Sequence, residues 1–153
     1  VPVVGAKAAG VKAMNLKEDD VLQSAFICNT SSFYLLTQRG SLKRVSIEEI
    51  PATSRAKRGL QVLRELKNKP HRVFLAGAVV EQGFVGDLFS TEVDGNDQTL
   101  LVQSNKGTIY ESRLQDLNLS ERTSNGSFIS DTISDEEVFD AYLQEVYTEL
   151  ESN

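Results

Sequence analysis

The sequence predicts an all-β protein built from propeller-like blades of antiparallel sheet. Residues 32–62 recur at residues 99–129, an offset of 67 positions, with matching glycines and apolar positions. Along the chain, short segments rich in β-branched and aromatic residues alternate with turn-forming residues. Such repeats are typical of propellers and other arrays of β units, in which neighbouring units share a core.

Each copy begins with a predicted β-hairpin. Gly40 and Gly107 occupy matching positions between two strand-forming segments. Glycine adopts the positive φ of tight hairpin turns without steric cost, so it marks the turn in each copy. The paired segments are residues 32–37 with 41–47, and residues 99–104 with 108–114.

Each hairpin is followed by a short acidic step and then by the motif Arg-x-x-x-Gly. The motif runs from Arg55 to Gly59 in the first copy and from Arg122 to Gly126 in the second. Features present in both copies are expected to maintain the fold. We therefore predict structural roles for Gly40, Arg55, Gly59, Gly107, Arg122 and Gly126.

Three further segments are predicted strands, at residues 21–28, 73–80 and 84–89. The spacing from Gly59 to Gly107 exceeds the spacing from Gly10 to Gly40 by 18 residues. We interpret residues 67–70 and much of 73–80 as an insertion, a strand or hairpin added to the second unit.

The end of the chain has a different pattern, which predicts an α-helix over residues 135–150. Ser134 and Glu137 have the spacing of a capping box, in which each side chain satisfies a free amide at a helix start. Apolar residues then recur at helical spacing, at Phe139, Leu143, Val146 and Leu150. This amphipathic helix would lie in an acidic tail, residues 131–153, that follows the β body of residues 1–130.

Charge is divided unevenly along the chain. The net charge is −6, but residues 131–153 carry −8 and contain no Lys or Arg, which leaves +2 for the rest. Residues 39–72 hold ten basic residues against three acidic ones. A basic body with an acidic end favours a polyanionic partner.

No residue pattern supports an enzyme in its own right. His71 is the only histidine and Cys28 the only cysteine, so a metal site built from these ligands is not expected. The stretch from Gly5 to Lys12 lacks the lysine directly after the second glycine that a phosphate-binding loop requires. The longest apolar run, residues 73–80, is too short for a membrane-spanning helix.

The first full copy carries the motifs of a known family. It reads Thr37-Gln38-Arg39-Gly40, Leu42-Lys43-Arg44, Glu48-Glu49-Ile50-Pro51, Arg55 and Gly59-Leu60. This order resembles a blade of the C-terminal DNA-binding domain of bacterial type IIA topoisomerase A subunits. Residues 5–14 resemble the topoisomerase IV branch of that family from Gram-positive bacteria. The resemblance covers about residues 3–130, and the second copy keeps less of the pattern.

The resemblance implies a β-pinwheel, of which residues 1–130 hold two to three blades of four antiparallel strands, with strands exchanged between neighbours. It implies binding and bending of duplex DNA without sequence specificity, in support of ATP-dependent strand passage, decatenation and relaxation. The catalytic residues, ATP and Mg²⁺ of such an enzyme belong elsewhere in the holoenzyme, so this segment is expected to be non-catalytic and without a cofactor. The implied partners are duplex DNA, the rest of the A subunit and the ATPase B subunit in an A2B2 assembly, in the cytoplasm at the nucleoid and away from membranes.

The predicted DNA contacts are basic residues that the scaffold does not require. Four basic residues of the first copy are replaced by uncharged or acidic residues in the second. Rows of Lys and Arg bind phosphates by releasing condensed counterions, without reading base sequence. The predicted contacts are Lys43, Arg44, Lys57 and Arg58, with Arg64, Lys67, Lys69 and Arg72 from the insertion region.

The sequence leaves two kinds of alternative open. The chain could be a propeller-like module that binds another protein, or the equivalent domain of a DNA gyrase A subunit. The acidic helix could cover an exposed sheet edge, or it could mimic DNA and compete for the basic residues.

Overall fold

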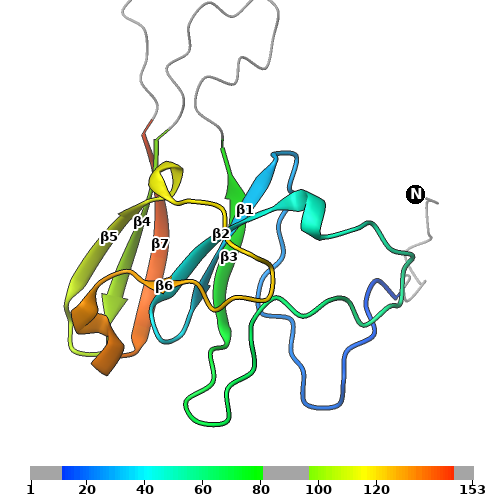
Figure 1. The fold of residues 1–153 in the computed structure, drawn as a ribbon, viewed down its shortest axis with the longest axis horizontal. Coiled ribbons are helices and arrows are strands. Elements are labelled where there is room, and N and C mark those ends of the chain that lie inside the picture. The colour runs from blue at the N-terminus through cyan, green and yellow to red at the C-terminus, as the bar shows by residue number, and fades with distance from the viewer. Residues whose placement is uncertain (1–11, 81–96, 147–153) are drawn as a thin grey trace, which may run out of the picture.

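Seven strands form two antiparallel sheets in the part of the chain that the structure describes, residues 12–80 and 97–146 (Figure 1). The structure is a computed structural model. The first sheet has the order β3-β1-β2-β6 and the second the order β5-β4-β7. The elements are β1 (Ser32–Thr37), β2 (Ser41–Ser46), η1 (Ile47–Glu49), β3 (Val73–Val79), β4 (Asp97–Ser104), β5 (Ile109–Arg113), η2 (Leu114–Asp116), β6 (Ser127–Phe128), η3 (Asp131–Asp135) and β7 (Val138–Val146), where η marks a 3-10 helix. The predicted all-β class is confirmed.

Both predicted hairpins are confirmed, and the two copies are built alike. β1 pairs with β2, and β4 pairs with β5. Gly40 has a φ of +82° and Gly107 a φ of +85°, a region that a residue with a Cβ adopts only with strain. In each turn the glycine amide donates to the carbonyl three residues earlier, over 2.9 Å. One 3-10 turn, η1 or η2, then follows each second strand.

The predicted helix over residues 135–150 is wrong, because residues 138–146 form strand β7. β7 pairs antiparallel with β4 along the length of that strand. Ser134 caps no helix, since its hydroxyl donates to the Asp131 carbonyl over 2.8 Å within η3, and the cap of η3 is Ser130 instead. Pairing with a distant strand edge satisfies the backbone of β7, and local spacing cannot reveal that partner.

β7 is the second copy of β3. The Gln38 amide donates to the Arg72 carbonyl over 3.0 Å, and the matching Asn105 amide donates to the Glu137 carbonyl over 2.8 Å. The sequence repeats as well, with Val73-Phe74-x-Ala76 recurring as Val138-Phe139-x-Ala141. The predicted strand over residues 73–80 is thus confirmed, but its interpretation as an insertion is wrong, because each unit contains it.

Strand β6 passes from the second repeat into the first sheet. It follows the second Arg-x-x-x-Gly motif and pairs antiparallel with β2. Gly126, with a φ of +70°, makes this crossing possible. A Cβ at Gly126 would lie 2.6 Å from the Leu42 carbonyl oxygen, whereas a Cβ at Gly59 would meet nothing within 4 Å. The strand exchange that the family resemblance implies is therefore present in this sheet.

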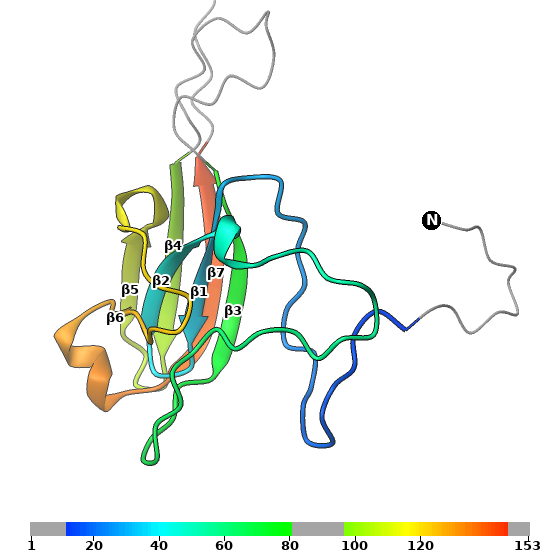
Figure 2. The same cartoon turned by 45° about the vertical axis from the view of Figure 1, so that its right-hand side comes forward.

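The hydrophobic core lies between the two sheets. Tyr34 and Leu36 from the first sheet meet Leu100 and Val102 from the second. Ile133, from η3, is fully buried in the same cluster. The two sheets lie side by side in Figure 1, and Figure 2 shows the loops of residues 12–30 and 50–72 extending away from the strands.

The opposite face of the first sheet is less completely covered. Residues 21–28, predicted as a strand, have no regular structure, so that prediction is wrong. Instead, the side chains of Gln23 and Ser24 donate to carbonyls of β3, over 3.3 and 3.2 Å. An apolar hollow of about 650 Å³ lies here. The predicted strand at residues 84–89 lies outside the described residues.

Candidate nucleic-acid interface

The loop of residues 50–72 carries most of the exposed basic side chains. It leaves η1, contains the first Arg-x-x-x-Gly motif, and returns to the sheet at β3. Six of the predicted contact residues are exposed here, namely Lys57, Arg58, Arg64, Lys67, Lys69 and Arg72. The loop therefore offers cationic groups to solvent.

Three surface hollows follow one another along this loop. The middle hollow, of about 670 Å³, is lined by Arg58, Arg64 and Arg72. Arg64 also lines a hollow of about 390 Å³ at the second-repeat loop, and Arg72 lines a hollow of about 430 Å³ with Lys69. We call Arg58, Arg64, Lys69 and Arg72 the basic band. Since neighbouring hollows share an arginine, the band is continuous.

Sequence reasoning missed one further basic residue of this surface. Lys17, from the N-terminal arm, lines the middle hollow, as do two acidic residues, Asp20 and Glu65. Lys17 has no counterpart in either hairpin repeat, so comparing the copies could not find it. The three-dimensional course of the arm brings it there.

Arg39, at the tip of the first hairpin, is held in place by three groups. Its Nη1 donates to the Lys69 carbonyl over 2.7 Å and lies 3.2 Å from Nε2 of His71. Its guanidinium lies over the Phe128 ring, 5.4 Å from the ring centroid, a favourable cation–π arrangement. Because arginine only donates, Nε2 of His71 accepts, and its Nδ1–H donates to Thr37. Burial and the Arg39 charge lower the pKa of His71, which favours this neutral form.

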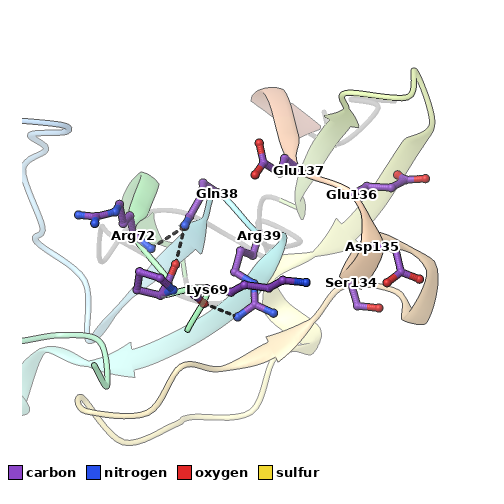
Figure 3. Close-up of a pocket in the computed structure, with 9 residues that line it drawn as sticks. Gln38, Arg39, Lys69, Arg72, Ser134, Asp135, Glu136 and Glu137 are labelled. Atoms are coloured by element: carbon purple, nitrogen blue, oxygen red, sulfur yellow. Dashed lines mark hydrogen bonds between the residues drawn. The ribbon is translucent and has the colours of Figure 1, made fainter. Parts of the chain in front are cut away.

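The hollow of about 430 Å³ has walls of opposite charge (Figure 3). Arg39, Lys69 and Arg72 line one side, and residues 134–137 line the other. The acidic segment is held by bonds of its own, since Glu136 accepts from the Tyr110 hydroxyl over 3.0 Å. In Figure 3, Ser134 and Asp135 lie across the gap from Arg39 and Lys69. Part of the acidic tail is thus fixed beside the basic band.

Lys43 does not lie on the surface, so the prediction that it contacts DNA is wrong. Its side chain is 2% exposed. Its Nζ donates to the carbonyls of Arg122 and Ser124, each over 2.6 Å, and to that of Val62. All three ammonium donors are therefore occupied by backbone oxygens.

Arg44 is also engaged within the fold. It is half-buried, and its Nε donates to the Ser32 hydroxyl over 2.8 Å. Because its head group joins strands, we do not include it in the proposed surface. Of the two arginines that begin the Arg-x-x-x-Gly motifs, Arg55 is exposed. Arg122 contacts the first repeat through its backbone, since its amide donates to Glu49 Oε1 over 3.1 Å.

The pH dependence of folding stability should report on Lys43. Burial lowers the pKa of Lys43 from 10.5 to about 8, with Glu49 raising it and Arg122 lowering it. Between these pH values the unfolded chain binds more protons than the folded one, so the free energy of unfolding should rise with pH. Denaturant unfolding from pH 8 to 10.5 should show this rise, and Lys43→Met should remove it. An unchanged slope in the variant would show that other groups cause it.

Within the described residues, no group of three or more His, Cys, Asp or Glu side chains is placed to hold a metal ion. None of their helices is long and apolar enough to cross a membrane.

Curated relatives are similar to this chain along most of its length. The A subunit of DNA topoisomerase 4 from Streptococcus pneumoniae serotype 4 is 96% identical over 149 residues, which are 97% of this chain and 18% of the relative. The A subunit of DNA topoisomerase 4 from Bacillus subtilis is 46% identical over 132 residues, which are 86% of this chain and 14% of the relative. The chain therefore spans less than a fifth of the length of these proteins.

A solved structure and a family model support the same assignment. A crystal structure of the C-terminal domain of DNA topoisomerase IV is similar to this chain, with a TM-score of 0.73 and 36% sequence identity. The match covers 95% of this chain and 41% of the chain in that structure. The model for the DNA gyrase C-terminal domain, a beta-propeller, matches residues 1–29 and 32–79. This chain therefore belongs to the family of DNA gyrase C-terminal beta-propeller domains, the family that its first repeat resembles.

Proposed function

We propose that this chain is the DNA-binding C-terminal part of the A subunit of a bacterial topoisomerase IV. Its similarity to the A subunits of topoisomerase 4 favours that enzyme over gyrase. In the intact protein the chain would bind and bend the duplex for ATP-dependent strand passage. The rest of the A subunit would supply the catalytic residues, and the ATPase B subunit would hydrolyse ATP. The whole enzyme would act in the cytoplasm, at the nucleoid.

The observation that carries this proposal is the continuous basic band. Arg58, Arg64 and Arg72 line one hollow together, and Lys69 extends the row. Exposed guanidinium and ammonium groups in a row neutralise successive phosphates and release counterions. Such contacts position the duplex without distinguishing its bases. We place the remaining exposed candidates, Lys57 and Lys67, at the margins of this surface.

Binding to duplexes tests the proposal directly. Two duplexes of equal length and unrelated sequence should bind the protein with the same affinity at low salt, as measured by fluorescence anisotropy. A strong preference for one sequence would contradict readout through the backbone, and an absence of binding to both would contradict the proposed function.

A protein contact is the second candidate function, supported by the apolar hollow of about 650 Å³. Exposed apolar side chains of the N-terminal arm, such as Val21 and Leu22 at 76% and 68%, lie along it. A protein segment would bury this surface. The charge of the basic band would be reversed in the intact protein. If DNA binding were then unchanged, this alternative would be favoured.

The acidic wall opposite the basic band should weaken DNA binding. Deletion of residues 131–153 would remove strand β7 as well as charge, so neutralisation is the sharper test. Asp135→Asn with Glu137→Gln should raise duplex affinity roughly two- to fivefold at low salt, because carboxylates near a phosphate repel it and salt screens that repulsion. Anisotropy titration measures the change.

The matched control is Glu111→Gln with Asp140→Asn, on the outer face of the second sheet. These residues are exposed and the net charge changes equally. An equal rise in both double variants would show that total charge, and not the acidic wall, limits binding.

A further inference from the structure

Lys43 lies where the loops of the two repeats meet. On β2 it stands directly opposite Leu35 of β1, so it projects to the same face of the sheet. Its ammonium reaches Val62 from the first-repeat loop, and Arg122 and Ser124 from the second-repeat loop. A fourth carbonyl, that of Glu121, lies 3.4 Å away. One side chain thus contacts both loops.

The neighbouring contacts depend on the same arrangement. The Arg64 amide donates to Oδ1 of Asn125 over 2.8 Å, and the Ser41 hydroxyl donates to the Asn125 carbonyl. The hollow of about 390 Å³ is lined by residues of both loops, including Arg64 and Ser124. The place of Arg64 in the basic band is therefore fixed partly by the second repeat.

We propose that Lys43 is a positioning residue, whose ammonium joins the loops of the two repeats and so sets the basic band for DNA. Carbonyl oxygens that are withdrawn from water without gaining a donor are costly, and three partly buried ones converge here on one cation. The same group cannot contact phosphate, since its donors point into the fold. The inference about DNA rests on the proposed function, whereas the joint between the loops does not.

The decisive experiment is chemical rescue in the intact protein. Lys43→Ala removes three methylenes and the ammonium, which n-propylammonium can replace. In the variant, amide exchange measured by mass spectrometry over residues 61–64 and 119–126 should speed up by roughly tenfold or more, because the loops open locally. Propylammonium should restore slow exchange, while equal concentrations of 1-propanol or sodium chloride should not. Duplex affinity should fall roughly three- to tenfold and recover with propylammonium at constant ionic strength.

Controls separate the possible failures. Lys57→Ala, which changes an exposed lysine in the same loop as Val62, should show no exchange response specific to propylammonium. If Lys43→Ala does not fold, Lys43→Met keeps the aliphatic stem and should show the faster exchange without rescue. Unchanged exchange in both loops, or equal rescue by 1-propanol, would overturn the proposal. If the unmodified protein fails to bind the duplex, the proposed function is contradicted. The exchange result still decides whether Lys43 joins the two loops.

Discussion

Gly40→Ala should destabilise the protein by about 2 to 5 kcal/mol, because the added methyl group meets both a strained backbone and a filled core. The left-handed backbone of Gly40 alone costs a residue with a Cβ about 1 to 2 kcal/mol. The added Cβ would also lie 2.8 Å from Cγ1 of Ile133 and closer still to its Cδ1. Overpacking a filled core costs about 1 to 3 kcal/mol. Denaturant unfolding measures the sum.

The second repeat supplies the control for this prediction. Gly107 has a φ of +85°, close to that of Gly40, but a Cβ there would meet nothing within 4 Å. Gly107→Ala should therefore cost only the backbone term, about 1 to 2 kcal/mol. In an Ile133→Ala background, Gly40→Ala should cost no more than Gly107→Ala does. Equal effects of the two glycine substitutions in the unaltered background would contradict the role of Ile133.

Charge reversal within the basic band should weaken DNA binding by about one to two orders of magnitude. Arg58→Glu with Arg64→Glu replaces two exposed cations that line the same hollow. Each lost phosphate contact reduces the salt dependence of binding by about one unit of log–log slope, so the pair should reduce it by about two. The weakening should be the same for duplexes of different sequence, because phosphates are common to all of them.

Lys12→Glu with Lys106→Glu is the matched control for the charge reversal. Both lysines are exposed and lie outside the basic band, in the arm and at the second hairpin tip. The net charge changes by the same amount, so this variant should lose much less affinity. Equal losses from the two double variants would show that the protein attracts DNA through its overall charge alone.

The parts of the fold that were predicted from sequence are those with local signals. Gly40 and Gly107 mark turns because the turn itself demands a positive φ. β7 was missed because its stability comes from β4, a partner more than thirty residues away in sequence at every pair of the ladder. The repeated Val-Phe-x-Ala sequence, at Val73 and Val138, was the signal that could have identified it.

The candidate site was predicted in part, and one error is instructive. The basic loop was found because clustered charge is visible in the sequence. Lys43 was assigned to DNA because the second copy has Tyr110 in its place. That difference has another cause, since Lys43 joins its own repeat to the next one through the carbonyls of residues 122 and 124. A residue that differs between the repeats can therefore be structural when its side chain bonds to the neighbouring repeat.

The salt dependence of duplex binding tests the central claim most directly. The affinity of the intact protein for a duplex would be measured over a range of salt concentrations. Contact of the basic band and its margins with roughly four to six phosphates predicts a log–log slope between about −4 and −5, reduced by about two in Arg58→Glu with Arg64→Glu. A slope near zero, or a slope that the double variant leaves unchanged, would contradict the claim that this surface binds DNA.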